Sequence, residues 1–251
     1  MVRNIGIVIL AAGLGTRMKS DKAKVLHEIC NRPMIQYVVD TAKAVAGSNV
    51  IVVVGHQADL VRQSAAQCGD FHYATQHKQL GTGHAVMCAL PHIPEGVQDV
   101  VILCGDVPLI RAETIEHLIY DHLRHRRHVT LLAVKMADPS GYGRVIFNES
   151  GKLTGIVEQA DADEAQKKIQ IVNSGIYVVN QTFLTYALPQ IRDDNKQKEI
   201  YLTDIIAIGR RLNKEMGAII SDDSEEILGV NSVSDLQHVE NIIKNWKSEL
   251  S

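Results

Sequence analysis

Apolar blocks alternate with amphipathic segments through the first half of the chain. Continuous apolar runs, rich in β-branched residues, occupy residues 5–10, 49–54, 97–103 and 128–135, with a shorter strand pattern at 71–75. Such runs are typical of strands that are buried on both faces. Apolar residues at helical spacing fill the intervals 33–46, 58–67, 81–90 and 112–126. This alternation predicts a doubly wound, mostly parallel sheet of the Rossmann-like α/β class, with right-handed crossovers.

The second half has a different pattern. Strand patterns cover residues 143–148, 152–158, 172–179, 216–220 and 226–230, and the first two are joined by a turn signal at 148–151. A helix is predicted with Thr203 or Asp204 as its N-cap, and an amphipathic helix is predicted to close the chain over 234–247. We therefore expect one domain of residues 1–231, with a main lobe of 1–136 and a smaller lobe of 137–231. Residues 232–251 are predicted to form a linker-like helix.

The loop after the first strand is the strongest local signal. It contains Ala11, Ala12, Gly13 and Gly15, whose small side chains let backbone N–H groups approach an anion closely. Arg17 and Lys24 add two positive charges. Ligands of α/β sheets bind at the carboxyl ends of the strands, so the loop predicts a polyphosphate site. A plain tight turn is the alternative.

Spacing excludes two familiar phosphate loops. The P-loop needs Lys and Ser or Thr after its last glycine, whereas Gly15 is followed by Thr16 and Arg17. The dinucleotide pattern needs a third glycine where Met18 stands. What remains is the pattern L-A-A-G-x-G-T-R-M, followed after five intervening residues by Lys24.

Asp106 follows a buried strand and is expected at the same edge of the sheet. A carboxylate together with phosphate oxygens is a usual way to hold Mg²⁺, so Asp106 is a candidate metal ligand. Without the glycine-rich loop, a helix-capping or turn role would be the simpler interpretation.

Gln76 follows another strand, and its amide could hydrogen-bond a base edge. Gly81 and Thr82 open a helix and offer backbone N–H groups nearby. A simple capped turn explains these residues equally well.

Composition narrows the classes of function. Hydrophobic residues make up 45% of the 251-residue chain and charged residues 22%, as in ordinary globular proteins. A net charge of −3 and 4% aromatic residues argue against nucleic-acid and membrane-surface binding. The four cysteines form no C-x-x-C pair, which disfavours structural zinc and a disulfide framework. With no signal peptide evident before the first strand, we expect a cytoplasmic protein.

A histidine-rich segment is a weaker candidate site. His117, His122, His125 and His128 lie among three arginines near one predicted helix end. Their spacing gives no convergent metal geometry, so we interpret them as a solvated basic helix face.

Several ordered motifs together resemble one family over nearly the whole chain. That family is the uridylyltransferase domain of bacterial N-acetylglucosamine-1-phosphate uridylyltransferase, a nucleotide-diphospho-sugar transferase. Beyond the opening loop, the matching runs are residues 79–85, 105–110, 141–144, 155–158, 173–177, 201–206 and 229–231.

The resemblance implies roles for individual residues. The nucleotide-binding residues would be Leu10, Ala11, Ala12, Gly13, Lys24, Gln76, Gly81, Thr82, Cys104, Gly105 and Asp106. The sugar-binding residues would be Gly143, Glu158, Asn173 and Asn231, so 1–136 would be mainly the nucleotide lobe and 137–231 the sugar lobe. Asp106 and Asn231 would bind Mg²⁺, and Arg17, Lys24 and Asp106 would be catalytic. The substrates would be UTP and N-acetylglucosamine 1-phosphate, and the products UDP-N-acetylglucosamine and pyrophosphate.

This sequence departs from the family pattern at three points. Ala23 replaces the usual proline before Lys24, and Cys104 stands where some relatives have tyrosine. The family is commonly bifunctional, with a hexapeptide-repeat acetyltransferase domain that we do not expect here. Two alternatives stay open. One is the same nucleotidyl transfer with another hexose 1-phosphate or with a nucleoside triphosphate of another base, and the other is a catalytically silent nucleotide-sugar sensor. The sequence leaves the oligomeric state open.

Overall fold

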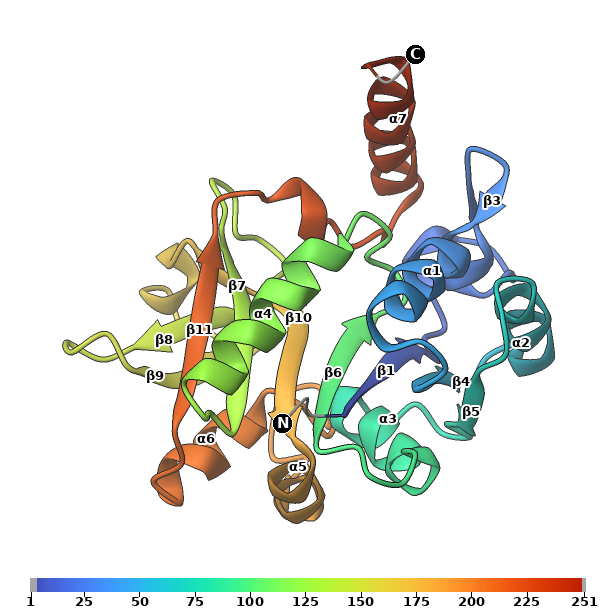
Figure 1. Ribbon diagram of the computed structural model, residues 1–251. Helices are drawn as coiled ribbons and strands as arrows, with labels where there is room; N and C mark the ends of the chain where they lie inside the picture. The colour runs from blue at the N-terminus through green and yellow to red at the C-terminus, as the bar shows by residue number, and fades with distance from the viewer. Residues whose placement is uncertain (1–3, 250–251) are drawn as a thin grey trace.

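The computed structural model describes residues 4–249, which form a central sheet covered by helices on both faces (Figure 1). Seven strands run across the sheet in the order β11-β7-β10-β6-β1-β4-β5. Their bounds are β1 Ile5–Ala11, β4 Val50–Val54, β5 His72–Thr75, β6 Asp99–Cys104, β7 Val129–Lys135, β10 Ile171–Asn180 and β11 Met216–Ser221. The predicted α/β class is therefore confirmed.

β1 lies in the middle of the parallel part of the sheet. It pairs with β4 and β6 in parallel, with Ala11 beside Val54 and Leu10 beside Cys104. The carboxyl ends of the three strands therefore meet at one edge, which is where the glycine-rich loop leaves β1.

Alternate side chains of β1 point into two separate core layers. Ile7 and Ile9 pack with helices α1, α2 and α4, whereas Val8 packs with α3, α5 and α6. The bounds are α1 Met34–Ala46, α2 Ala58–Ala66, α3 Thr82–Ala89, α4 Ala112–Arg124, α5 Gln181–Ala187 and α6 Asp204–Arg211. Burial on both faces explains why the strand is a continuous apolar run.

The remaining elements are smaller or peripheral. Strands β8 (Arg144–Phe147) and β9 (Leu153–Val157) form a hairpin attached to β10, as the turn signal predicts. Strands β2 (Glu28–Ile29) and β3 (Arg32–Pro33) form a short hairpin that sequence reasoning missed. Helix α7 (Val233–Glu249) projects from the body at the top of Figure 1. Single-turn 3₁₀ helices occur at Thr16–Met18, Lys24–Leu26, Leu90–His92, Gln166–Lys168, Leu188–Gln190 and Glu225–Ile227.

The sheet is mostly parallel, as the sequence predicts, and β10 is the exception among its seven central strands. β10 lies between β6 and β7 and runs antiparallel to both, a direction that the sequence pattern did not specify. The chain returns from β7 through the β8–β9 hairpin without a helical crossover, and a direct return favours antiparallel pairing.

The strand predicted over 226–230 is wrong. Glu226 lies in the single 3₁₀ turn Glu225–Ile227. Its side chain is buried and accepts a hydrogen bond from Thr114 at 2.8 Å. Ile227 and Val230 pack into two different core clusters, which accounts for their apolar character without a sheet.

The prediction that the histidines of the histidine-rich segment are solvated is wrong for His122. His122 is fully buried, and its ring nitrogens contact Thr130 Oγ1 at 2.9 Å and Asp99 Oδ1 at 3.3 Å. It lies on the same helix face as Ile115 and Leu118, at i, i+3 and i+7 spacing, so helical periodicity should have indicated its burial.

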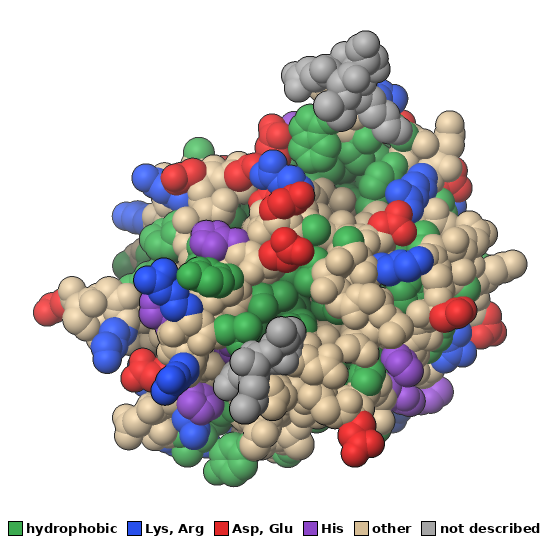
Figure 2. All heavy atoms as spheres, in the orientation of Figure 1, with side chains coloured by type: hydrophobic (Ala, Val, Ile, Leu, Met, Phe, Trp, Pro, Cys, Tyr) green, Lys and Arg blue, Asp and Glu red, His purple; other side chains and the backbone are tan. Residues whose placement is uncertain are grey.

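The visible surface carries interspersed charges of both signs (Figure 2). This distribution agrees with the small net charge of the sequence. No helix within residues 4–249 combines the length and apolar character that crossing a membrane requires.

Candidate nucleotide-transfer site

A cavity of about 430 Å³ opens at the carboxyl ends of β1 and β6. Ten of the eleven predicted nucleotide-binding residues line it: Leu10, Ala11, Ala12, Gly13, Lys24, Gln76, Gly81, Thr82, Cys104 and Asp106. Residues far apart in sequence therefore meet where the strand order predicts a ligand site.

Gly105 is the exception among the eleven, because it does not line the cavity. Its N–H donates to the Leu10 carbonyl at 2.9 Å, and a Cβ there would lie 3.0 Å from the same oxygen. Gly105 therefore lets β6 end close against β1.

Two glycines shape the rim of the cavity. Gly15 has φ +67°, and a Cβ on it would lie 2.7 Å from Cβ of Lys24. Gly81 has φ +108°, and a Cβ would lie 2.6 Å from the Ile200 carbonyl oxygen. Both positions need a residue without a side chain, since positive φ and close backbone approach each disfavour one.

Four charged or polar side chains meet beside the loop. Lys24 forms an ion pair with Asp106, and its Nζ donates to Asn231 Oδ1 at 3.1 Å. Arg17 donates to the same Oδ1 at 2.7 Å. Asn231 comes from more than 200 residues further along the chain than Arg17 and Lys24.

This arrangement fits a magnesium ion. The Lys24 ammonium touches both the Asp106 carboxylate and Asn231 Oδ1, so these two oxygens converge on a single cationic group. Among the described residues there is no cluster of three or more His, Cys, Asp or Glu side chains suited to a metal. One carboxylate and one amide oxygen suit Mg²⁺, which is typically held by few protein ligands together with water and substrate phosphates.

Cys104 lies against strand β10. Its Sγ is 3.7 Å from the Gly175 carbonyl oxygen, and a Cβ on Gly175 would lie 2.8 Å from this sulfur. Burial, and secondly the Asp106 carboxylate, raise the pKa of the Cys104 thiol to about 12. The thiol therefore stays protonated and serves as a spacer rather than a nucleophile.

Gln76 is nearly buried, and its amide has a fixed orientation. Nε2 donates to the Gly81 carbonyl at 3.1 Å, so its second hydrogen is available to His84 Nδ1 at 3.0 Å. With the amide in this orientation, His84 Nδ1 is the acceptor of that bond. Because both amide hydrogens are used, Gln76 offers a ligand its Oε1 acceptor.

The predicted sugar residues separate into two groups. Glu158 and Gly143 are adjacent, since a Cβ on Gly143 would lie 3.2 Å from Glu158 Oε2. Asn173 joins them through its N–H, which donates to the Gly143 carbonyl at 2.8 Å. Asn231 lies instead with Lys24 and Asp106.

Burial raises the pKa of Glu158, and a hydrogen bond from Thr203 at 3.1 Å opposes this increase. Thr203 stands at the N-cap of α6, but no hydrogen bond from its side chain caps the helix. The predicted capping residue therefore donates a hydrogen bond to a carboxylate that the sequence predicts for the site.

Besides Gly15 of the glycine-rich loop, five residues that the sequence analysis did not assign to the site line the cavity: Leu14, Val25, Gln79, Ala85 and Glu199. Glu199 is brought there by tertiary hydrogen bonds of its neighbour Ile200, which donates to the Leu80 carbonyl at 2.7 Å and accepts from Gly83 at 2.8 Å. No strand-end or glycine signal marks this segment. Gly15 was recognisable from the loop pattern.

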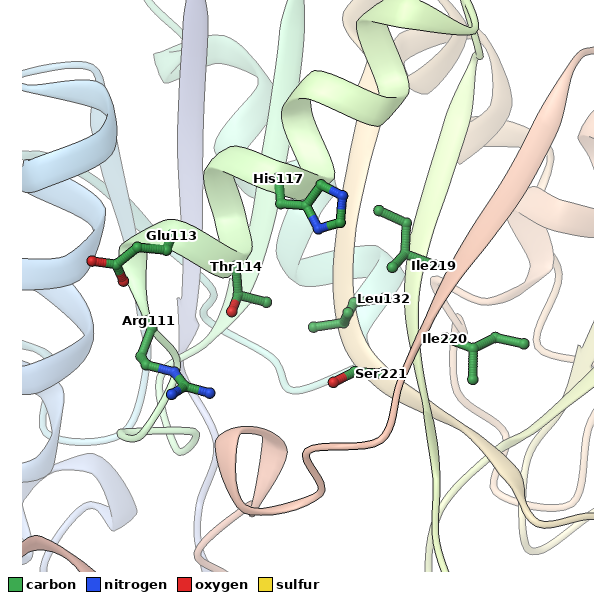
Figure 3. A pocket seen from close by; sticks show the side chains of 8 residues that line it. All are labelled: Arg111, Glu113, Thr114, His117, Leu132, Ile219, Ile220 and Ser221. Carbon is green, nitrogen blue, oxygen red and sulfur yellow. The ribbon is translucent and has the colours of Figure 1, made fainter. Parts of the chain in front are cut away.

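A larger cavity of about 700 Å³ lies elsewhere, between α4 and β11 (Figure 3). Its one guanidinium, that of Arg111, is bound by Asp223 and Glu226. None of the predicted site residues lines it, and it has no glycine-rich backbone. We therefore assign the phosphate chemistry to the smaller cavity.

Comparisons with known proteins agree with this geometry. The chain is 45% identical over 243 residues to "Bifunctional protein GlmU" of Caldanaerobacter subterraneus subsp. tengcongensis, covering 96% of this chain and 52% of that protein. It is 41% identical to the protein of the same name from Clostridioides difficile, over 98% of this chain and 53% of the relative. The chain thus spans about half the length of these relatives. A third, from Desulfotalea psychrophila, is 42% identical over 91% of this chain and 67% of its own length.

A solved structure shares the fold. It comes from Bacillus anthracis and is named as a glucose-1-phosphate thymidylyltransferase in complex with sucrose; the TM-score is 0.72 at 19% identity, over 95% of this chain and 94% of that chain. The family model described as "MobA-like NTP transferase domain" matches residues 7–197, a span that includes the glycine-rich loop, Lys24 and Asp106. With its fold, its cavity and its relatives in agreement, the chain belongs to the MobA-like NTP transferase family.

Proposed function

We propose that this protein makes UDP-N-acetylglucosamine and pyrophosphate from UTP and N-acetylglucosamine 1-phosphate. The observation that carries the proposal is the convergence of Arg17, Lys24, Asp106 and Asn231 beside the glycine-rich cavity. A silent sensor would not need this whole set of charged and polar groups. The relatives named GlmU support the choice of substrates.

In the proposed reaction an oxygen of the sugar phosphate attacks the α-phosphorus of UTP in line. The new O–P bond forms as the bond from that phosphorus to the bridging oxygen breaks, and pyrophosphate leaves. Lys24 and Arg17 neutralise charge on the phosphates, and the loop backbone holds the triphosphate in place. Bound Mg²⁺ on Asp106 and Asn231 would polarise the phosphate oxygens. No protein nucleophile is required.

The two lobes bind different substrates in this reaction. Residues 1–136 hold the nucleotide, and residues 137–231 hold the sugar through Gly143, Glu158 and Asn173. Helix α7, Val233–Glu249, follows the second lobe. The proposed location is the cytoplasm, where these nucleotides are available.

The test is pyrophosphate release from a panel of nucleoside triphosphates and sugar 1-phosphates. We expect N-acetylglucosamine 1-phosphate to be preferred over glucose 1-phosphate by about 10- to 100-fold in kcat/KM, the effect of orphaning a buried hydrogen-bonding group. Glu158→Ala is expected to raise the KM of the sugar phosphate and to leave that of UTP nearly unchanged. Binding of UTP without pyrophosphate release on any sugar phosphate would instead identify a sensor.

A further inference from the structure

Helix α7 begins with a capping box directly after Asn231. Ser232 Oγ accepts from the Asp235 N–H at 3.2 Å, and Asp235 Oδ2 accepts from the Ser232 N–H at 2.9 Å. This reciprocal pair is the usual capping box, with Ser232 as N-cap and Asp235 as the third helical residue. The same Oδ2 also accepts from the Asn231 N–H at 2.9 Å. The box therefore extends back to the candidate metal ligand.

Asn231 is fixed on its other side as well. The preceding residue, Val230, donates its N–H to the Asp106 carbonyl at 2.9 Å. The Asn231 side-chain Nδ2 donates to the Gly229 carbonyl at 3.1 Å, which sets the orientation of the amide. Its Oδ1 is consequently the end presented to Lys24 and Arg17.

The middle of α7 packs against segments from both sides of the candidate site. Val239, Ile242 and Ile243 belong to one buried cluster with Met18, from the phosphate-loop segment, and Leu109, which follows Asp106 closely. The helix that supplies Asp235 is thereby held relative to the loop and to the metal carboxylate.

We propose that Asp235 is a positioning residue, which holds Asn231 Oδ1 beside the Asp106 carboxylate so that both can ligate one divalent cation. This inference rests on the proposed function, because it takes Asp106 and Asn231 as the metal ligands. It gives α7, expected from the sequence to be only a linker-like helix, a part in the site.

The experiment measures Mn²⁺ binding in the presence of UTP, with free Mn²⁺ followed by electron paramagnetic resonance. Asp235→Ala should weaken Mn²⁺ binding about tenfold, the scale seen for partners that orient metal ligands. In the pyrophosphate-release assay, Asp235→Ala should need a higher Mg²⁺ concentration for its half-maximal rate and should keep most of its kcat at saturating Mg²⁺. UTP binding in excess EDTA should be unchanged.

Two matched variants separate positioning from helix capping. Ser232→Ala removes the other half of the box but keeps the Asp235–Asn231 bond, so its Mn²⁺ affinity should stay within about twofold of wild type. Asp235→Glu, the commoner residue in this motif, should restore most of the affinity. Melting temperatures report the loss of capping in each variant.

The outcomes distinguish this inference from the proposed function. Wild-type Mn²⁺ affinity in Asp235→Ala, or an equal loss in Ser232→Ala, would overturn the role of Asp235, as would a wild type that binds no Mn²⁺ with UTP. Failure of the wild type to release pyrophosphate with N-acetylglucosamine 1-phosphate would overturn the proposed function alone, because the Mn²⁺ measurement needs no turnover.

Discussion

His84 is expected to control which nucleobase the site accepts, although it does not line the cavity. It accepts one of the two hydrogen bonds that orient the Gln76 amide, and Gly81 accepts the other. In this orientation Gln76 presents an acceptor, which suits the N3–H of uracil and not the bare N3 of cytosine. His84→Phe keeps a ring of similar size and removes the acceptor.

The magnitude follows from counting these bonds. Each contributes about 1 kcal/mol net, so two bonds favour the observed orientation over the flipped amide by about 2 kcal/mol, or roughly 30-fold. Removing one bond reduces the bias by about 1 kcal/mol, or about fivefold. We therefore expect the kcat/KM ratio of UTP to CTP to fall about fivefold in His84→Phe.

The assay is pyrophosphate release with each nucleotide at saturating sugar phosphate. Cys88→Ala is the matched control, because Cys88 Sγ lies 3.9 Å from the other ring nitrogen, Nε2, and its loss leaves the Nδ1 acceptor in place. Its UTP-to-CTP ratio should match the wild type. An active His84→Phe enzyme with an unchanged ratio would refute the assignment of the Gln76 orientation.

Three further predictions follow from the site. Asp106→Ala should lower kcat by about 10²-fold or more, the scale of losing one preorganised electrostatic group, and near-normal turnover at saturating Mg²⁺ would contradict its metal role. Lys24→Ala and Arg17→Ala should each lower kcat more than they raise KM for UTP, since charge shifts in the transition state; steady-state kinetics showing only a raised KM would make that residue a ground-state binder. Burial raises the pKa of Glu158, so its carboxyl stabilises the fold at acid pH and that contribution is lost as pH rises through the folded-state pKa. Glu158→Gln, which can keep the Thr203 bond, should therefore raise the melting temperature at neutral pH and lose this advantage at acid pH, whereas a pH-independent gain would argue against a buried charge.

The sequence was sufficient for features that depend on local pattern. Strands β1, β4 and β6 are continuous apolar runs because both faces of each are buried, and that burial is visible in the chain itself. Their parallel order brings the carboxyl ends together, so the sequence alone placed the loop at Gly13 and the carboxylate of Asp106 at one edge of the sheet.

Tertiary structure decided the features that depend on distant partners. β10 is antiparallel to its neighbours because the chain returns to the sheet through a hairpin. Segment 226–230 is not a strand, and Glu226 within it binds Arg111 and Thr114. Thr203 has the sequence signature of a helix cap, yet its hydroxyl bonds Glu158, 45 positions away in the chain.

The same distinction runs through the site itself. The sequence identified Gln76 as a base-reading candidate, but only its contacts with Gly81 and His84 decide which end of the amide is offered. It likewise identified Asn231, whereas the bond from its N–H to Asp235 and its meeting with Lys24 exist only in the fold. The spacing of apolar residues and the glycine content indicate the burial and the backbone freedom of each segment. The orientation of a polar side chain depends instead on partners that lie far away in the sequence and meet it only in the folded chain, so a local pattern cannot predict it.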